Sequence, residues 1–445
     1  MSRIRPLSGF PELLPSQRLV EQYVLDRLRE TFELHGYANI ETRAVEPMSQ
    51  LARKGEIDKE IYVLRRLSAD PGAADTDELG LHFDLTVPFA RYVLENAGHL
   101  AFPFRRYQIQ KVWRGERPQE GRYREFTQAD IDIVGENTLA AHHDVEIPLV
   151  MLEALENLHD SVGLPPVLMR VNNRQLAEGF YRGLGIEDTA AVLQRVDKLE
   201  KIGAEAVIES LAEIGLDDER AGKVVALARI RTEDGSFVDK VRALGVGHEL
   251  LDQGLELLSA VVAAAREAVP GRLVADLSIA RGLDYYTGTV YETALVGYES
   301  MGSISSGGRY DSLATDGRQT YPGVGISLGV SRMLVPLLAK GRLVASRSVP
   351  TAVLVAVNDE ETRSEADAVA RALRGRGIPT EVAPKADKFG KQIRHADRRG
   401  IPYVWFGGME GEVKDIRSGD QLAADASSWE PPAEDRTVHI SGAWD

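Results

Sequence analysis

Two neighbouring stretches of the chain alternate between apolar and polar side chains and carry charged groups along one side. They are "RYQIQKVWR" and "EFTQADIDIVG", and the turn-rich "GERPQEGRYR" joins them. Alternation with a period of two indicates β-strands, so the pattern predicts a hairpin of two strands. Because side chains alternate between the faces of a strand, one face of this hairpin carries arginines and amides beside amides and carboxylates.

That polar face limits the folds open to the chain, because burying an unpaired charge costs several kcal/mol. We therefore expect the face to line a pocket for a ligand with both signs of charge. Asp130 or Asp132, together with Gln128, would suit an ammonium group, and Arg114 would suit a phosphate or a carboxylate. A second interpretation stays open on the pattern alone, since one face of an antiparallel sheet is often solvent-exposed.

Composition narrows the class of protein. The 445 residues favour two or three domains. The formal net charge is −15, yet basic residues gather within residues 104–124 and 385–399, where a polyanion could bind. Cysteine is absent, which excludes disulfides, thiolate metal sites and a cysteine nucleophile. We find no secretory signal and no apolar stretch long enough to span a bilayer, so we expect a cytoplasmic protein without membrane contact.

Helical and strand patterns divide the chain into regions. Residues 20–35 predict an amphipathic helix that ends at Gly36, and "YANIETRAVEP" predicts one strand that ends at Pro47. "LHFDLTVPFARYVL" predicts a strand followed, beyond Pro88, by a helix. Residues 186–262 are rich in Ala, Leu, Glu and Lys at helical spacing and predict a helical insertion.

The last region begins after a linker at residues 336–350. Strands and helices alternate over residues 351–445, which predicts a small α/β domain with a mostly parallel sheet. One of its helices carries a basic stripe, with apolar Phe389, Ile393 and Ala396 on another face. The stripe consists of Lys388, Lys391, Arg394 and Arg398. It is compatible with contact to an RNA backbone, and a merely solvated helix is the alternative.

Three glycine-containing motifs remain. "RGLDYYTGTVYE" has the composition of a strand but also an arginine and two acids, and "SSGGRYDSL" predicts a tight turn at Gly307 and Gly308. "YPGVGISLGVSRM" predicts a strand that enters a helix with Arg332 in its first turns, because its glycine spacing does not fit a dinucleotide-binding turn. The histidine pair in "HHDVE" predicts the start of a helix, so we assign no metal site.

Together these segments resemble class II aminoacyl-tRNA synthetases, and specifically the histidine–tRNA ligase family. "ARGLDYYTGTVYE" and "GGRYDSL" are similar to the two histidine signatures of the family, and "WRGERPQEGRYREFTQADIDIVG" and "GVGISLGVSRM" to class II motifs 2 and 3. "GYANIETRAVEP" stands in the place of motif 1, the dimer-forming element. The resemblance implies an α+β catalytic domain on an antiparallel sheet over residues 1–335, with the insertion at 186–262, and an anticodon-binding α/β domain over 351–445.

The resemblance also implies a reaction and its partners. ATP and L-histidine would give histidyl-adenylate and pyrophosphate, and the histidyl group would then move to histidine tRNA. Since the substrate carboxylate attacks the α-phosphate, the site needs positioning and charge neutralisation rather than a side-chain nucleophile. Mg²⁺ is expected with ATP, and a homodimer is expected from the family.

Site residues follow from the same resemblance. The catalytic residues would be Arg114, Arg281 and Arg332, placed along the phosphates, and Glu116 and Arg122 would complete the ATP site. The histidine site would consist of Asp84, Leu85, Thr86, Gln128, Asp132, Arg281, Tyr285 and Tyr286. The tRNA would contact Gln119, Arg124, Lys388, Lys391 and Arg394. Asp132 and "FDLT" depart from the glutamate and the Pro-Glu-Gly-Thr segment of many bacterial members.

Three other functions fit the sequence less well. A non-catalytic paralogue that regulates ATP phosphoribosyltransferase would lack the anticodon domain and lose signature residues, and this chain keeps both. An RNA-binding or sensor module would have no use for Arg114, Arg281 and Arg332 together. Another class II ligase would not need the two tyrosines and the Gly-Gly-Arg-Tyr-Asp segment.

Overall fold

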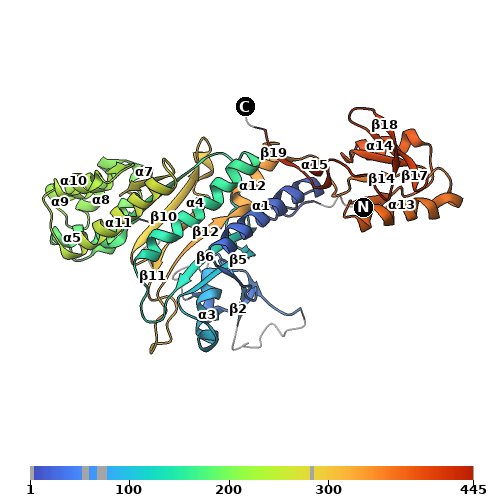
Figure 1. Cartoon of the computed structure of the whole chain (residues 1–445). Coiled ribbons are helices and arrows are strands. Elements are labelled where there is room, and N and C mark those ends of the chain that lie inside the picture. The colour runs from blue at the N-terminus through green and yellow to red at the C-terminus, as the bar shows by residue number, and fades with distance from the viewer. Residues whose placement is uncertain (1–4, 53–59, 68–77, 281–284, 444–445) are drawn as a thin grey trace. The chain divides into compact units, whose positions relative to one another are not determined.

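The structure, a computed structural model, describes residues 5–52, 60–67, 78–280 and 285–443. Contacts between residues divide the chain into two compact units (Figure 1). The first unit holds most of the chain up to Pro336. The second contains the chain from Leu337 onward together with Glu12–Leu25 and Ser161–Gly163. Among the described residues, no helix is both long and apolar enough to cross a membrane.

A nine-stranded sheet forms the centre of the first unit, as far as the described residues show. In spatial order its strands are β1 (Ala38–Asn39), β5 (Phe104–Trp113), β6 (Glu125–Val134), β12 (Gly323–Gly329), β11 (Ser305–Tyr310), β10 (Thr289–Leu295), β7 (Val167–Asn173), β9 (Leu273–Asp276) and β8 (Arg231–Thr232). All neighbours are antiparallel except the pairs β1–β5 and β7–β9. The predicted antiparallel sheet is therefore confirmed at its centre, and the sheet becomes mixed toward its edges.

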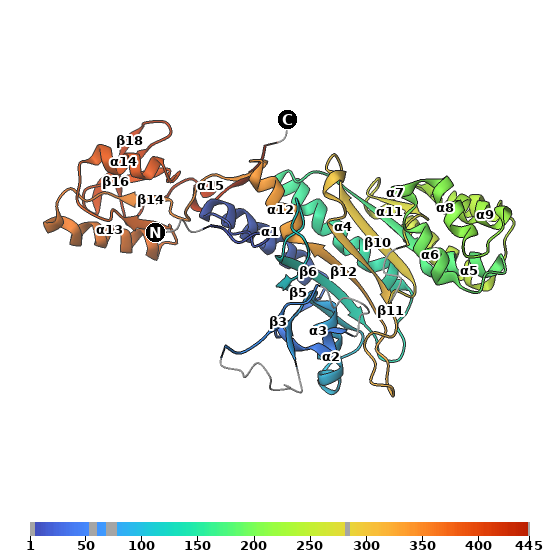
Figure 2. The same ribbon diagram turned by 180° about the vertical axis from the view of Figure 1, so that it is seen from behind.

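Two long helices lie side by side along one face of this sheet (Figures 1 and 2). They are α1 (Pro15–Leu34) and α4 (His142–Val162). The Tyr107 hydroxyl of β5 donates to Glu33 of α1 at 2.6 Å, and the Tyr291 hydroxyl of β10 donates to the Asp144 carbonyl of α4 at 2.5 Å. Since side chains alternate along a strand, these helices cover the apolar face of the hairpin and leave the polar face for other partners.

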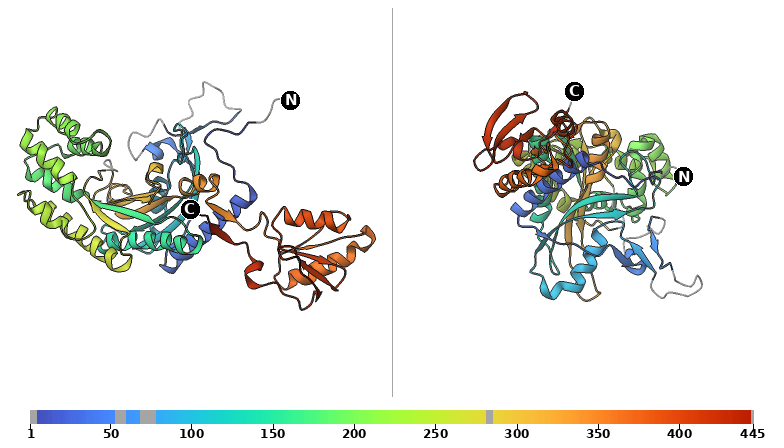
Figure 3. Two further views of the ribbon diagram at one scale, coloured as in Figure 1. Left: turned by 90° about the horizontal axis from the view of Figure 1, so that it is seen from above. Right: turned by 90° about the vertical axis from the view of Figure 1, so that its right-hand side faces the viewer.

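The predicted insertion is helical, and helices extend beyond it on both sides. They are α5 (Arg174–Gly183), α6 (Thr189–Val196), α7 (Leu199–Ile202), α8 (Ala204–Ala212), α9 (Asp218–Ala228), α10 (Phe237–Arg242) and α11 (Glu249–Ala268). They gather at the end of the sheet where β8 lies, drawn in green and yellow-green (Figure 3). The backbones of α5 and α11 meet closely, because a Cβ on Gly179 would lie 2.2 Å from the Leu251 nitrogen.

Two predictions near the N-terminus need correction. "YANIETRAVEP" forms two short strands in different sheets, because β2 (Val45–Pro47) pairs with β4 (Leu79–Leu81), which also pairs with β3 (Val63–Leu64). Between β1 and β2, amide side chains replace the ladder of backbone hydrogen bonds: Gln108 and Gln110 both donate to Thr42, each at 2.9 Å. Helix α3 (Thr86–Asn96) begins before Pro88, which is tolerated because the first turn leaves its N–H groups unpaired anyway.

Both histidine-signature segments also differ from the sequence prediction. Strand β10 begins at Thr289, so residues 285–288 are not part of it, and residues 281–284 lie outside the described chain. The predicted tight turn at Gly307 and Gly308 is wrong, because both lie inside β11. A Cβ on Gly307 would lie 2.1 Å from the Gly325 carbonyl oxygen, and one on Gly308 would lie 2.8 Å from the Tyr286 ring. These glycines permit close approach rather than a turn.

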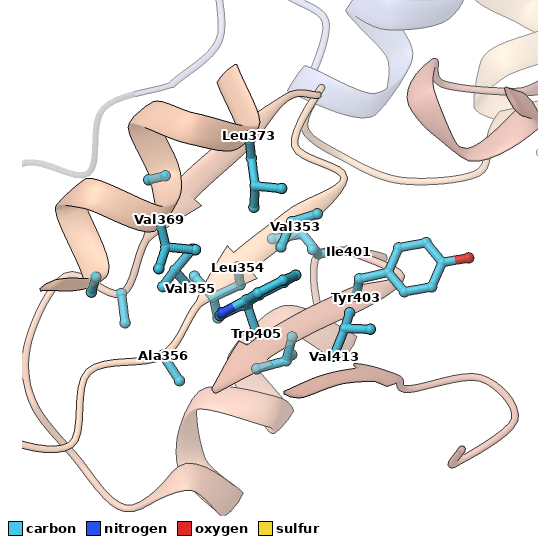
Figure 4. Close-up of a cluster of buried hydrophobic side chains, with 14 of the residues drawn as sticks. Val353, Leu354, Val355, Ala356, Val369, Leu373, Ile401, Tyr403, Trp405 and Val413 are labelled. Carbon is cyan, nitrogen blue, oxygen red and sulfur yellow. The ribbon is translucent and has the colours of Figure 1, made fainter. Parts of the chain in front are cut away.

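The second unit contains a five-stranded sheet of described strands. In spatial order they are β15 (Thr380–Val382), β14 (Val353–Val355), β16 (Tyr403–Phe406), β17 (Glu410–Asp415) and β18 (Gln421–Asp425). The first three are parallel, as predicted, and the last two add antiparallel pairs. Its core packs Val353 and Trp405 against Val369 and Leu373 of α13 (Arg363–Gly375) (Figure 4).

The remaining elements are short or join the others. They are α2 (Met48–Leu51), α12 (Val330–Ala339), α14 (Phe389–Asp397), α15 (Ala433–Arg436), β13 (Leu343–Ala345) and β19 (Ile440–Gly442). Strand β12 runs directly into α12, as predicted from "YPGVGISLGVSRM". Residues 336–350, expected to be a linker, include the end of α12 and strand β13, which pairs with β19.

Candidate active site

Two adjoining cavities lie over the polar face of the central strands. The larger has a volume of about 390 Å³ and the smaller about 160 Å³. Both are lined by Arg114, Gln128, Tyr285 and Tyr286. The polar face that the sequence predicts to line a pocket therefore does so, and the alternative of a solvent-exposed face is excluded.

Arginines from three parts of the fold line the larger cavity. Arg114 follows β5, Arg122 comes from the loop after it, and Arg332 comes from the first turn of α12. Arg332 donates from Nε and Nη2 to the Met301 carbonyl at 3.2 and 3.0 Å. These guanidinium groups give the cavity a cationic wall that could receive the phosphates of a nucleotide.

Arg114 is held in place from two sides. Its Nε donates to the Phe83 carbonyl at 3.0 Å, and its guanidinium lies 5.2 Å from the centre of the Phe126 ring. Its backbone nitrogen donates to the Arg124 carbonyl at 2.9 Å, which joins the two ends of the loop. A guanidinium fixed in this way needs little reorganisation when a charged ligand arrives.

Acidic side chains line the smaller cavity. Asp84, Asp130 and Asp132 all border it, and each is almost fully buried. Asp84 accepts from the backbone nitrogen of Val87 at 3.1 Å, so it also pairs with an N–H group in the first turn of α3. The three carboxylates could receive a cation or several N–H donors.

Arg106 neutralises part of this acidic charge from below the cavity. It is fully buried, and its Nη2 lies 2.5 Å from Oδ2 of Asp132, directly across the hairpin. The Tyr310 hydroxyl donates to the other Asp132 oxygen at 2.7 Å. The pKa of Asp130 is raised to about 7, mainly by burial and also by the nearby Asp132 carboxylate, while Arg106 opposes the shift.

Glycines and tyrosines shape the smaller cavity. Asp132 lies against Gly325, where a Cβ would sit 1.9 Å from Oδ1 of the carboxylate. The rings of Tyr285 and Tyr286 lie 4.1 Å apart, centre to centre, and burial raises the pKa of Tyr285. Tyr286 in turn rests on Gly308. The glycines of β11 and β12 thus make room for the carboxylate and phenol groups that line the cavity.

Most residues of the predicted ATP and histidine sites meet at these cavities. The larger is lined by Arg114, Glu116, Arg122 and Arg332. The smaller is lined by Asp84, Thr86, Gln128, Asp132, Tyr285 and Tyr286. Leu85 does not line either one: its side chain is fully buried. Arg281 lies outside the described residues.

The predicted tRNA-contacting residues are dispersed. Gln119 is exposed on the loop after β5, whereas Arg124 donates to the Glu116 carbonyl at 3.0 Å and so helps to hold that loop. The basic stripe is exposed along α14, but Phe389, expected on its apolar side, is 41% exposed. Buried Gln392 takes that place, because its amide pairs with the backbone of Val357.

Sequence reasoning missed several lining residues. Tyr310 and Ser327 border the smaller cavity and Glu60 the larger. The alternation along β11 would have placed Tyr310 beside Gly308, had the turn not been expected there. The predicted strand at β12 already places Ser327 on the same face as Gly325. Glu60 belongs to no motif, and nothing in the sequence points to it.

Comparisons with known proteins agree along the whole chain. The family model described as "Histidyl-tRNA synthetase" matches residues 9–333, and "Anticodon binding domain" matches residues 351–417. The histidine–tRNA ligases of Cutibacterium acnes and Micrococcus luteus are 67% and 61% identical, over the full length of both chains in each case. The crystal structure of histidyl-tRNA synthetase from Nostoc sp. PCC 7120 is 34% identical, with a TM-score of 0.84 over 96% of this chain and 98% of that one.

Proposed function

The chain belongs to the histidyl-tRNA synthetase family, and from this membership we propose how its two cavities charge tRNA with histidine. The enzyme attaches L-histidine to its tRNA in an ATP-dependent reaction that passes through histidyl-adenylate. The observation that supports the assignment of the site is that a cavity lined by three arginines adjoins a cavity lined by three aspartates. The first suits the nucleotide, and the second suits the amino acid.

In the first step, a carboxylate oxygen of histidine attacks the α-phosphorus of ATP, and the bond to pyrophosphate breaks. No side chain forms a bond, so the protein contributes orientation and positive charge. Arg114 and, from the family resemblance, Arg281 are assigned to the α-phosphate, and Arg332 is assigned to the γ-phosphate end. Glu116 and Arg122 lie on the loop after β5, and Nη1 of Arg122 is 3.3 Å from Oε2 of Glu116. These two side chains would hold the adenine.

Histidine would lie in the smaller cavity, with its ammonium group toward Asp84, Thr86 and Gln128. Asp132 would accept a hydrogen bond from the imidazole ring, and the tyrosine pair would form the wall of the pocket. A site built from such hydrogen bonds rejects isosteres that cannot make them by a large factor. Buried Leu85 would act only by fixing the chain between Asp84 and Thr86.

In the second step, the histidyl group moves to the terminal adenosine of the tRNA. We assign the catalytic domain to residues 1–335 and the anticodon-binding domain to residues 351–445, with Gln119 and Arg124 near the acceptor end. The described residues hold no ready cluster of three metal-binding side chains, so we propose that Mg²⁺ arrives with ATP and is held largely by phosphate oxygens. A cytoplasmic homodimer completes the proposal.

Amino-acid-dependent exchange of pyrophosphate into ATP tests this function directly. Run with each of the twenty amino acids, the assay is expected to give exchange with histidine alone. Exchange with another amino acid would assign a different specificity. No exchange at all, from protein that is folded, would instead favour a non-catalytic paralogue.

Reversing charge on the basic stripe separates the two steps. The double variant Lys388→Glu, Arg394→Glu is expected to lower kcat/KM for tRNA by roughly 10-fold or more, because phosphate contacts supply much of the affinity for nucleic acid. Histidine-dependent pyrophosphate exchange should not change. Arg371→Glu on exposed α13 is the control and should leave both activities intact. Equal charging by all three proteins would show that α14 does not face the tRNA.

A further inference from the structure

One buried acid of the smaller cavity has no role in the function proposed above. Asp130 lies between Gln128 and Asp132 on the same face of β6, and only 1% of its surface is exposed. Among the described residues its Oδ1 has no hydrogen-bond partner, and the same is true of Oε1 of Gln128. Buried acceptors without partners are rare because they cost free energy, so two in one cavity indicate a ligand that donates to them.

Both carboxylate oxygens of Asp132 have partners, in contrast to Oδ1 of Asp130. Arg106 holds one of its oxygens and the Tyr310 hydroxyl donates to the other. Asp84 accepts from the start of α3. Asp130 therefore keeps the most open acceptor of the three acids at this cavity.

The surroundings of Asp130 favour a ligand that brings a proton. Arg106 is the cation that faces it, whereas Asp132 and Asp84 add negative charge, and the hydroxyl of Ser327 is nearby. Burial and these two acids raise the pKa of Asp130 to about 7, although Arg106 and Ser327 oppose the shift. The carboxyl group thus holds a proton far more readily than an exposed aspartate, and it can share that proton with a basic ring nitrogen.

We propose that Asp130 is a specificity-determining residue whose Oδ1 binds one nitrogen of the histidine ring while Asp132 binds the other. The proton between Asp130 and the ring lies on one or the other, so both contacts are hydrogen bonds in either case. An amide or aliphatic side chain cannot offer two such nitrogens at the two ends of a ring. This inference rests on the proposed function and deepens it.

The test compares Asp130→Asn and Asp130→Ala with the unaltered protein in histidine-dependent pyrophosphate exchange. Both variants are expected to raise KM for histidine by on the order of 10- to 100-fold, with KM for ATP unchanged. The two ring-methylated histidines are used as competitors. Asp130→Ala should tolerate better the isomer whose methyl group faces position 130. Asp160→Asn, on exposed α4 surface, is the matched control and should behave as the unaltered protein.

The melting temperature distinguishes a ligand-binding role of Asp130 from a purely structural one. Replacing an acid that only stabilises the fold would lower the melting temperature, whereas replacing Asp130 is expected to raise it. The unfolded carboxyl has a pKa near 3.8, whereas the pKa of the folded one is about 7. Ionisation therefore opposes folding increasingly as pH rises from 4 to 7. Asp130→Asn should melt at a higher temperature than the unaltered protein at pH 8, and this advantage should disappear near pH 4.

Each result decides between the alternatives. An unchanged histidine KM and unchanged rejection of both methylated isomers in the two variants would overturn the role of Asp130. A lower melting temperature at pH 8 together with a raised KM for ATP would indicate general damage and would count against it equally. If the unaltered protein gave no exchange with histidine, the proposed function itself would fail, which is a distinct outcome.

Discussion

Arg114→Ala is expected to lower histidine-dependent pyrophosphate exchange by on the order of 10²- to 10³-fold, which is the usual cost of removing one fixed donor from a developing charge. The loss should appear in kcat more than in KM for histidine, because the guanidinium is assigned to the phosphate that is attacked. The hydrogen bond to Phe83 and the contact with Phe126 hold the group ready for that task. Initial rates over a matrix of ATP and histidine concentrations give both constants.

Arg117 supplies the control for this prediction. It lies on the same loop, is exposed and does not line either cavity. Arg117→Ala should keep exchange within about twofold of the unaltered protein, since an exposed arginine away from the phosphates adds little. Equal losses of exchange activity in the two variants, or near-normal exchange with Arg114→Ala, would contradict the assignment of Arg114 to the reacting centre.

Arg106→Met should lower the free energy of unfolding by about 3–5 kcal/mol, because it leaves buried carboxylates without their cation. Arg106 is fully buried, contacts Asp132 at 2.5 Å and lies 4.2 Å from the centre of the Phe89 ring. Because methionine fills a similar volume, the loss in the free energy of unfolding would reflect the missing charge rather than a cavity. Urea unfolding monitored by circular dichroism, with the slope checked for two-state behaviour, measures it.

The neighbouring arginine is the matched control for this stability prediction. Arg105 is on the same strand, pairs with Glu146, and has a side chain that is 29% exposed. Arg105→Met should cost about 1 kcal/mol or less, as surface ion pairs usually do. Similar losses for the two variants would mean that the Arg106–Asp132 pair contributes no more than an exposed one.

The faces of the central strands were predictable, but their partners were not. A period of two is enough to assign Arg114, Gln128 and Asp132 to one side of a hairpin. The same pattern cannot say which strand lies next to which. The segment predicted as one strand therefore forms two strands, β1 and β2, in different sheets. Likewise, Gly307 and Gly308 lie within strand β11 rather than in a turn.

The contents of the site were partly predictable for a related reason. Motif residues such as Arg332 are recognisable by sequence spacing, whereas the pairing of Arg106 with Asp132 depends on a register that is set by the length of the intervening loop. Glu60 reaches the larger cavity from a segment outside every motif. Arg124, grouped with the tRNA-contacting residues, also holds the loop by a hydrogen bond to a backbone carbonyl, which no sequence pattern indicates.

A crystal structure with a non-hydrolysable histidyl-adenylate analogue tests the central claim most directly. The phosphate mimic should lie in the larger cavity within hydrogen-bond reach of Arg114, and the imidazole should lie in the smaller one between Asp130 and Asp132. An analogue bound with its ring away from both acids, or with its phosphate position beyond the reach of Arg114, would contradict the assignment of the two cavities.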